Sequence, residues 1–348
     1  MAKKETAHTT LYRAYRPADF DEVRGQEHVV GVLEKAIKNG SVAHAYLFCG
    51  GRGTGKTSVA RILAKRLGVS DKDLYEIDAA SNRGIEDIRQ LREGVYAMPF
   101  ESKYKFYIID EAHMLTKEAW NAFLKTLEEP PAHAIFVLAT TERDKVPETI
   151  QSRCEIYTFK QPTREILAQI VTDIAKQEGT AIERPAAELV ALLAEGSFRD
   201  ALSILQKVLS ASGKKVTASD VEDVAGAPRG ELVRQILTAL AAKDSNAALS
   251  AMEIAVRENM DARTLAKLLI HRMRVILLMR YAPNLSASLS AELTEADQEL
   301  AKSLSKETAV NSELLKSLLE AYGAMAYAAV PHLPLELAII EICGAIPA

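Results

Sequence analysis

Cysteine is scarce in this chain, which holds only Cys49, Cys154 and Cys343 among its 348 residues. The three lie so far apart in the sequence that no C-x-x-C pair and no zinc-ligand spacing exists. The pattern argues against a disulfide framework or a cysteine zinc site. We expect three reduced, small and buried thiols.

Long apolar runs and an excess of charge are also missing. No hydrophobic run approaches the roughly 20 residues needed to span a bilayer, and the polar stretch Met1 to Thr10 lacks the apolar core of a signal peptide. The 43 Lys and Arg against 47 Asp and Glu leave a net charge of −4. Any nucleic acid must therefore be bound by a local basic patch. We expect a cytoplasmic protein that makes no membrane contact.

The chain is long enough for two or three globular domains, and 48% of its residues are hydrophobic and 26% charged. Short apolar runs alternate with amphipathic stretches between Ala45 and Pro162, which predicts buried parallel strands joined by helices. In such a sheet, ligands bind where the strands end. The expected strands are Ala45–Cys49, Leu74–Ile77, Lys105–Ile109 and Ala134–Leu138.

Helical periodicity replaces this alternation from Thr163 to about Gln206, and it resumes from Glu231 to Ala348 after the break at Ala225–Gly230. The sequence therefore predicts an α/β domain followed by a small helical domain and an all-α domain. Their expected bounds are 1–161, 162–226 and 227–348.

A glycine-rich segment matches the phosphate-binding pattern G-x-x-x-x-G-K-[ST] between an expected strand and an expected helix. Its glycines let backbone N–H groups face phosphate oxygens, and the following helix directs its positive end there. Lys56 is expected to reach the β and γ phosphates of ATP, and the Thr57 hydroxyl to bind Mg²⁺. The alternative is a glycine-rich turn without a ligand. The expected ligand-binding residues are Gly50, Gly51, Arg52, Gly53, Thr54, Gly55, Lys56, Thr57 and Ser58.

Two acids, Asp110 and Glu111, end the apolar run that begins at Phe106. Buried strands rarely end in paired carboxylates for packing reasons. We expect Asp110 to hold the Mg²⁺ shell and Glu111 to polarise a water for attack on the γ phosphate. The alternative is a solvated strand end with a capping Asp. His113 is expected to be a local hydrogen-bonding residue, because Glu111 already fills the role of base.

Further motifs follow one another along the chain: Tyr15–Pro17, Val23–Gln26, His44–Leu47, Glu76–Ser81, Asp110–Leu115, Asn121–Pro131, Ser152–Cys154 and Gly196–Leu202. In their order and spacing they resemble the gamma/tau subunits of bacterial DNA polymerase III, which are AAA+ clamp loaders. The resemblance is dense from Tyr12 to about Leu205. It implies a RecA-like AAA+ domain with a parallel sheet and flanking helices, a small helical lid domain and an all-α collar domain that oligomerises.

The resemblance also implies roles for single residues. Arg153 would be an arginine finger acting in trans on the ATP of a neighbouring subunit, where such a group is worth on the order of 10³ to 10⁵ in rate. Arg199 would be the second sensor and Thr141, with Thr140 close behind, the first. Tyr12 would lie beside the adenine. The alternatives are a surface arginine for Arg153, a solvated helix cation for Arg199 and core packing for Tyr12.

The segment Ser81–Arg92 offers cations at the start of an expected helix. By the resemblance, Arg83 and Arg89 are candidates for contacts to the DNA backbone. The alternative is a solvated helix face on which Glu86 and Asp87 balance the arginines.

Two features depart from the family pattern. Gamma/tau chains usually carry a four-cysteine zinc module after the P-loop helix, but here only the cysteine-free Gly68–Asp73 intervenes, so we expect no zinc. The chain also stops at Ala348, after the expected collar, so we expect it to be gamma-like in scope.

The resemblance implies an ATP-hydrolysing motor subunit that uses MgATP to open the sliding clamp and load it on primed DNA. Its partners would be other clamp-loader subunits, copies of itself, the clamp and the DNA. The alternatives are another clamp-loader subunit, delta-prime-like or similar to the small subunits of replication factor C, and a nucleotide-insensitive scaffold. Kinases and branch-migration helicases lack some of the motifs given above.

Overall fold

A computed structural model describes residues 10–82, 84–283 and 293–344. The chain forms two compact units, Met1–Leu167 with Ala194–Leu202 and Ala168–Leu193 with Ser203–Ala348. Within the described residues, no helix combines the length and the apolar character that crossing a bilayer requires.

The first unit is built on a parallel five-stranded sheet with the strand order β2-β3-β4-β1-β5. The three inner strands are buried over nearly their whole length, as expected of a parallel sheet covered on both faces. The four predicted strands are confirmed, whereas the edge strand β5 was missed. The strands are β1 (Ala45–Cys49), β2 (Leu74–Asp78), β3 (Lys105–Asp110), β4 (Ala134–Thr140) and β5 (Glu155–Thr158).

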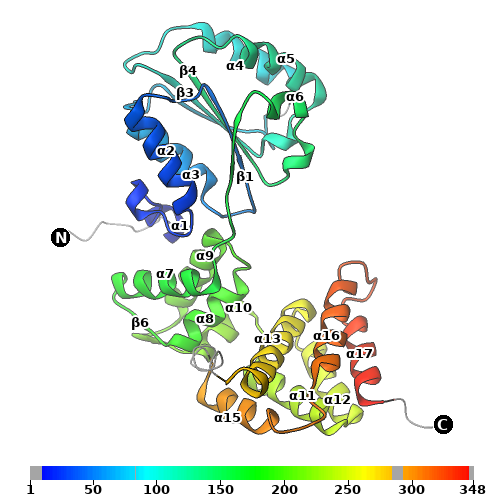
Figure 1. Cartoon of the computed structure of the whole chain (residues 1–348). Coiled ribbons are helices and arrows are strands. Elements are labelled where there is room, and N and C mark those ends of the chain that lie inside the picture. Colours follow the sequence, from blue (N-terminus) through cyan, green and yellow to red (C-terminus); the bar gives the residue numbers. More distant parts are fainter. Residues whose placement is uncertain (1–9, 83, 284–292, 345–348) are drawn as a thin grey trace. The chain divides into compact units, whose positions relative to one another are not determined.

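Helices cover both faces of this sheet (Figure 1). Because side chains alternate along a strand, Tyr46 and Phe48 of β1 pack on the side of α2 and α3, and Leu47 packs on the side of α4 and α5. The helices are α1 (Leu11–Ala14), α2 (Glu27–Asn39), α3 (Lys56–Arg66), α4 (Ile85–Tyr96), α5 (Lys117–Glu128) and α6 (Glu148–Gln151), with short 3₁₀ turns η1 (Phe20–Glu22), η2 (Ala112–Met114) and η3 (Arg143–Lys145).

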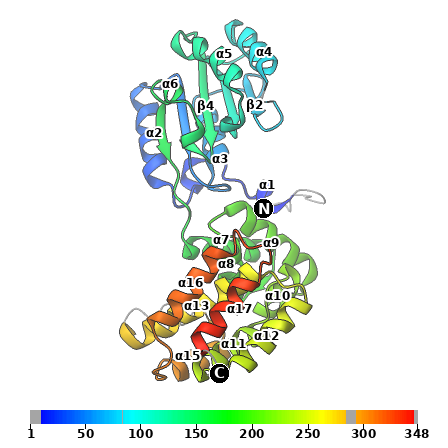
Figure 2. The same ribbon diagram turned by 90° about the vertical axis from the view of Figure 1, so that its right-hand side faces the viewer.

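The second unit is mostly helical, as predicted, and its C-terminal helices pack around one continuous apolar core (Figure 2). A two-stranded parallel pair, β6 (Ala181–Ile182) with β7 (Lys215–Val216), was not expected. The helices that lie wholly in this unit are α8 (Arg184–Leu193), α10 (Ala218–Ala225), α11 (Gly230–Ala242), α12 (Ser245–Arg257), α13 (Ala262–Tyr281), α15 (Glu295–Leu304), α16 (Ser312–Ala324) and α17 (Leu333–Cys343).

Two helices, α7 (Arg164–Gln177) and α9 (Phe198–Ala211), have residues in both units. All three cysteines are free thiols. Cys49 is buried, as expected, but Cys154 and Cys343 are only partly buried. For those two residues the expectation of full burial was wrong, because Cys154 lies beside the edge strand and Cys343 ends α17.

Candidate active site

The glycine-rich loop joins β1 to α3, and its backbone conformation depends on glycine. Gly53 (φ +69°) and Gly55 (φ +100°) are in the left-handed region, which is strained for other residues. A Cβ on Gly50 would lie 2.5 Å from the carbonyl oxygen of Phe159. Helix α3 starts at Lys56 directly after this loop. The N–H groups of its first turn can therefore bind phosphate oxygens.

Lys56 is buried within the loop, with 6% of its surface exposed. Its Nζ donates to the carbonyl oxygens of Gly50 (2.7 Å) and Gly51 (2.8 Å). Burial lowers the pKa of this ammonium, while the charges of Glu111 and Asp110 act in the opposite direction. An ammonium has three N–H donors, so it can bind a phosphate oxygen in addition to these carbonyls.

The other predicted loop residues differ in their exposure. Thr54 is buried, and its Oγ1 donates to the carbonyl oxygen of Gly51 at 2.9 Å, which closes the turn. Arg52 is exposed and Ser58 is half-buried. The loop is therefore a turn closed by its own hydrogen bond, and Arg52 is an exposed cation on it.

Thr57 and Asp110, 53 positions apart in the sequence, lie next to each other. The Thr57 Oγ1 donates to Oδ2 of Asp110 at 2.8 Å, and Asp110 Oδ1 accepts from the N–H of Glu111 at 3.0 Å. A hydroxyl and a carboxylate side by side are oxygen ligands of the kind Mg²⁺ takes alongside phosphate oxygens and water. The residues therefore fit the predicted ion. Across the described part of the chain, no group of three or more His, Cys, Asp or Glu could hold a metal.

Glu111 lies at the same edge of the sheet, with a left-handed backbone (φ +47°) directly after β3. Thr141, which follows the neighbouring strand β4, donates its hydroxyl to Oε2 of Glu111 at 3.2 Å. The residue expected to act as base and the residue expected to be the first sensor are thus in direct contact. A hydrogen bond of this kind fixes the carboxylate's orientation.

His113 joins this cluster and carries a side chain only 7% exposed. Its Nδ1 lies 3.0 Å from Thr140 Oγ1 and 3.5 Å from Glu111 Oε2, and its Nε2 lies 3.3 Å from Glu142 Oε1. These contacts fit a local hydrogen-bonding role for His113. Sequence reasoning missed Glu142, although its position directly after Thr140–Thr141, at the end of β4, was an available signal.

Gln26 and Arg16 were quoted only as parts of motifs, yet Gln26 contacts the loop and Arg16 interacts with the charge of Asp110. Gln26 is fully buried, and its amide binds the backbone of Lys160 in both directions (2.7 and 3.1 Å) and the carbonyl oxygen of Thr54 at 3.4 Å. Burial lowers the pKa of Arg16, and the charge of Asp110 partly opposes this change. Gln26 thus connects the start of α2 with the loop.

Arg199 lies beside the ring of Tyr12. Its guanidinium carbon lies 5.0 Å from the centre of the Tyr12 ring, and Tyr12 is half-buried. Just before it, the N–H of Phe198 donates to the carbonyl oxygen of Gly53 at 3.0 Å. The segment that carries Arg199 is therefore attached to the glycine-rich loop within the first unit.

Arg153 belongs to a different cluster on the surface of this unit. Its Nη2 donates to Oε1 of Glu128 at 2.6 Å, and its Nη1 donates to the carbonyl oxygen of Thr149 at 2.7 Å and to Ser152 Oγ at 3.3 Å. Its side chain is 34% exposed. A neighbouring molecule could therefore contact it.

The two candidates for contacts to DNA are Arg83 and Arg89. Arg89 is exposed on α4 and pairs weakly with Glu86 at 3.5 Å. Arg83 lies outside the described residues. An exposed pair at this distance contributes little to stability, so Arg89 can bind an anion at low cost.

Models of three protein families match successive parts of the chain. "DNA polymerase III, delta subunit" matches residues 25–83 and 69–163. "DNA polymerase III clamp loader subunit, ATPase lid domain" matches residues 166–214. "DNA polymerase III subunits gamma and tau domain III" matches residues 216–347. Together the matches extend over nearly the whole chain.

Curated relatives agree with these matches. The DNA polymerase III subunit tau of Bacillus subtilis (strain 168) is 36% identical over 359 residues, covering 97% of this chain and 63% of the relative. The gamma/tau subunit of Mycobacterium tuberculosis (strain ATCC 25618 / H37Rv) is 39% identical, covering 79% and 52%. The tau subunit of Escherichia coli (strain K12) is 34% identical, covering 86% and 50%. The chain thus spans between half and two thirds of the length of these relatives.

Among solved structures, the RuvB Holliday junction branch migration motor of Thermotoga maritima has a similar fold. Its TM-score is 0.52 at 24% identity, with 65% of this chain and 79% of that chain covered. At this identity, the likeness concerns the fold alone.

Proposed function

The chain belongs to the gamma/tau family of DNA polymerase III clamp-loader subunits, and we propose that it hydrolyses ATP to open the sliding clamp and load it on primed DNA during replication. The observation that carries this proposal is the 2.8 Å hydrogen bond between Thr57 and Asp110. It supports an ion site directly beside the buried ammonium of Lys56, and Glu111 follows Asp110 in the chain.

Each side chain of this cluster has a distinct part in the proposed hydrolysis. Lys56 offsets the charge of the β and γ phosphates, and Thr57 with Asp110 holds Mg²⁺, which neutralises phosphate charge when bound. Glu111 accepts a proton from the attacking water, and Thr141 keeps its carboxylate in place. The Asp110–Glu111 pair at the end of β3 supports hydrolysis over transfer to a substrate hydroxyl, because Glu111 can serve as the base for a water.

The reaction also needs a cation from a second subunit. We assign this role to Arg153, whose partly exposed guanidinium is bound to Glu128 and Thr149 rather than to the glycine-rich loop of its own chain. Arg199 and Tyr12 stay in the same subunit as the ATP. Their cation–π contact supports placing the sensor and the adenine-binding residue side by side, because it holds the Arg199 guanidinium at the Tyr12 ring.

We further propose the domain division 1–161, 162–226 and 227–348, with the last domain joining this subunit to copies of itself and to other clamp-loader subunits. A stripe of exposed apolar side chains on α17 supports an assembly role. Its members are Leu333 (44% exposed), Leu337 (52%) and Ile340 (43%). Contiguous exposed apolar residues commonly mark protein–protein surfaces.

Contacts to the DNA backbone are proposed for Arg83 and Arg89. Removing one arginine that binds a phosphate should make the dependence of DNA affinity on salt less steep. Measuring DNA affinity at several salt concentrations checks this, and an unchanged slope for Arg89→Ala would contradict the assignment.

The whole proposal is tested by measuring ATP turnover of the protein alone, with partner subunits, and with sliding clamp and primed DNA added. We expect stimulation only in the complete mixture. Arg153→Ala should keep its ATP affinity and lose the stimulated turnover by roughly 10³-fold, because its cation stabilises only the transition state. Stimulated turnover unchanged by this substitution would rule out the finger role.

A second candidate, a delta-type subunit, is favoured by the delta-subunit model that matches residues 25–83 and 69–163. If the chain were a delta-type scaffold that does not respond to nucleotide, Lys56→Ala would leave the turnover of the complete mixture unchanged, whereas in a motor subunit it would lower that turnover. The same turnover measurement therefore separates the two candidates.

A further inference from the structure

Glu128 is the acidic partner of Arg153. It is the last residue of α5, and its Oε1 accepts a hydrogen bond from Nη2 of Arg153 at 2.6 Å. Two further acceptors, the carbonyl oxygen of Thr149 and the hydroxyl of Ser152, bind Nη1 of the same guanidinium. Three acceptors on three residues therefore fix the plane of the guanidinium.

The pair is too exposed to be a major source of stability. The side chains are 34% exposed for Arg153 and 47% for Glu128, and pairs of this kind change an equilibrium by at most about fivefold. This preference is nevertheless enough to select one orientation of a long, flexible arginine. A guanidinium has five N–H donors, so one that binds these three acceptors can still donate to a phosphate oxygen.

The support behind Glu128 is rigid. Helix α5 buries Ala119, Trp120, Phe123 and Leu127 against the sheet, and Thr116 caps its start. A carboxylate at the end of a well-packed helix occupies a well-defined position. Groups that act in catalysis must be held in such positions by neighbouring residues, because small displacements lower the rate strongly.

We propose that Glu128 is a positioning residue for Arg153. It holds the guanidinium in the orientation in which Arg153 reaches the γ phosphate bound by the neighbouring subunit. This inference rests on the proposed function, since it requires Arg153 to act in trans. Glu128 itself touches neither ATP nor water in the reaction.

Mixing two variant subunits in one assembly shows in which subunit the loss of Glu128 lowers ATP turnover. Lys56→Ala makes a subunit that offers only its finger, and Arg153→Ala makes one that offers only its ATP site. When both are assembled with partner subunits, sliding clamp and primed DNA, turnover arises where the two meet. Adding Glu128→Ala to the Lys56→Ala subunit should lower the kcat of this mixture about two- to fivefold, with KM unchanged.

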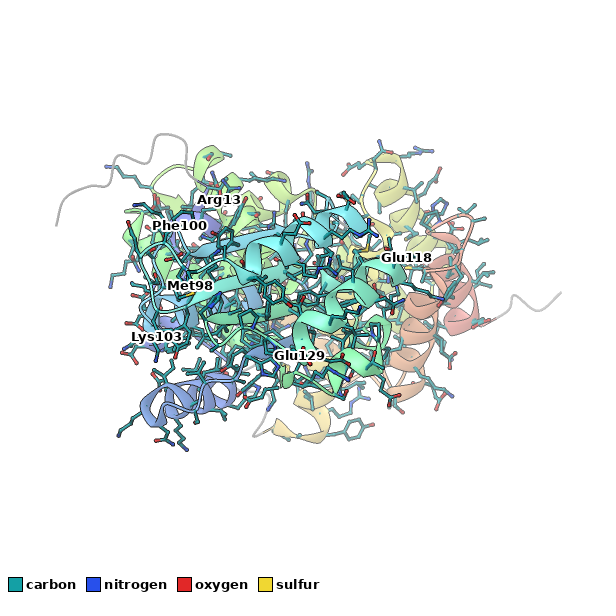
Figure 3. The ribbon with its side chains drawn as sticks, turned by 90° about the horizontal axis from the view of Figure 1, so that it is seen from above. Arg13, Met98, Phe100, Lys103, Glu118 and Glu129 are labelled. Carbon is teal, nitrogen blue, oxygen red and sulfur yellow. The ribbon has the colours of Figure 1, made fainter. Side chains whose placement is uncertain are left out.

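The matched controls separate positioning from a structural defect. Glu128→Ala in the Arg153→Ala subunit should leave turnover unchanged, because that finger is already absent. Glu129→Ala removes the adjacent carboxylate (Figure 3) and should have no effect in either subunit. Glu128→Gln keeps an acceptor oxygen and should restore more than half of the lost rate.

Each contrary result has a distinct meaning. If Glu128→Ala lowers turnover equally in either subunit, the loss comes from a folding defect and the positioning role is wrong. If Glu128→Ala causes no loss in the finger-donating subunit, the positioning role is also wrong. If the mixture of Lys56→Ala and Arg153→Ala subunits is no more active than either variant alone, Arg153 does not act in trans and the proposed function is contradicted. The role of Glu128 is then excluded as well.

Discussion

Asp73 is a buried carboxylate whose charge is satisfied mainly by backbone N–H groups. It accepts N–H bonds from Phe100 (2.6 Å), Glu101 (2.9 Å) and Ser102 (2.8 Å). Burial by itself would raise the pKa of Asp73, but these hydrogen bonds outweigh it and hold the pKa well below the usual 3.8. Asp73 thereby anchors the loop that displays the exposed side chains of Met98 and Phe100 (Figure 3).

Asp73→Asn should therefore destabilise the first unit by on the order of 2 kcal/mol at pH 7, because the amide replaces an acceptor oxygen with a donor that faces N–H groups. A carboxyl with a depressed pKa stabilises the fold above its unfolded pKa and loses this effect as pH falls toward the folded pKa. The difference from the parent protein should hold between pH 7 and pH 5 and shrink at pH 3.

Urea unfolding followed by tryptophan fluorescence measures the stability of the first unit, which contains Asp73. Trp120 is the chain's single tryptophan and is buried in that unit. Asp71→Asn removes an exposed carboxylate two positions away and should change stability by less than about 0.5 kcal/mol. Equal losses for the two variants would mean that the backbone N–H bonds to Asp73 contribute nothing.

At the scale of residues, the sequence predicted the roles of single residues better than the contacts between residues far apart in the chain. Lys56, Thr57, Asp110 and Glu111 could be assigned because each follows a motif with a fixed relation to a strand or helix. The contacts of Glu128 with Arg153 and of Arg199 with Tyr12 join residues far apart in the chain. Such pairs depend on packing, which one sequence without its fold does not specify.

Among secondary-structure elements, burial made the three inner strands easy to predict, while the edge strand β2, which is only partly buried, was predicted from its short apolar run. The inner strands β1, β3 and β4 are buried on both faces and form continuous apolar runs in the sequence. Strand β5 is an edge strand, Glu155–Thr158, with mixed exposure and only four residues. It gives neither an apolar run nor a clear alternation, and the two-residue strands β6 and β7 are too short to give any pattern.

Gly53 joins the glycine-rich loop to the start of α9 through a hydrogen bond and a close contact. Its carbonyl oxygen accepts from the N–H of Phe198 at 3.0 Å, and a Cβ on Gly53 would lie 2.0 Å from Ser197 Oγ. Gly53→Ala should therefore weaken ATP binding at least tenfold, since a left-handed alanine costs about 1–2 kcal/mol before the clash is counted. Titration with a fluorescent ATP analogue measures the loss.

A second substitution separates the clash from the backbone strain. Gly53→Ala combined with Ser197→Gly removes the clashing hydroxyl and should recover part of the affinity, leaving the cost of the φ of +69°. If Gly53→Ala alone binds ATP as well as the parent protein, the close contact between the loop and Ser197 does not matter for binding.

On the scale of the whole molecule, the two compact units separate the candidate chemistry from the proposed assembly surface. The loop, the acids and Arg153 all belong to the first unit, and the α17 stripe belongs to the second. A change on α17 should thus affect assembly without altering the ATP site of an isolated subunit.

Leu337→Asp tests this separation, because Leu337 is the most exposed member of the stripe at 52%. Burying a leucine at an interface contributes roughly 1.5–3 kcal/mol, so the variant should associate with its partners about 10- to 100-fold more weakly. Light scattering over a range of protein concentrations reports the mass of the assembly, and ATP titration of the dilute subunit should show unchanged affinity. Val32→Asp, a change at a similarly exposed position on α2 (50%), should leave the mass unaltered. An assembly that keeps its mass with Asp at position 337 would exclude α17 from the subunit interface.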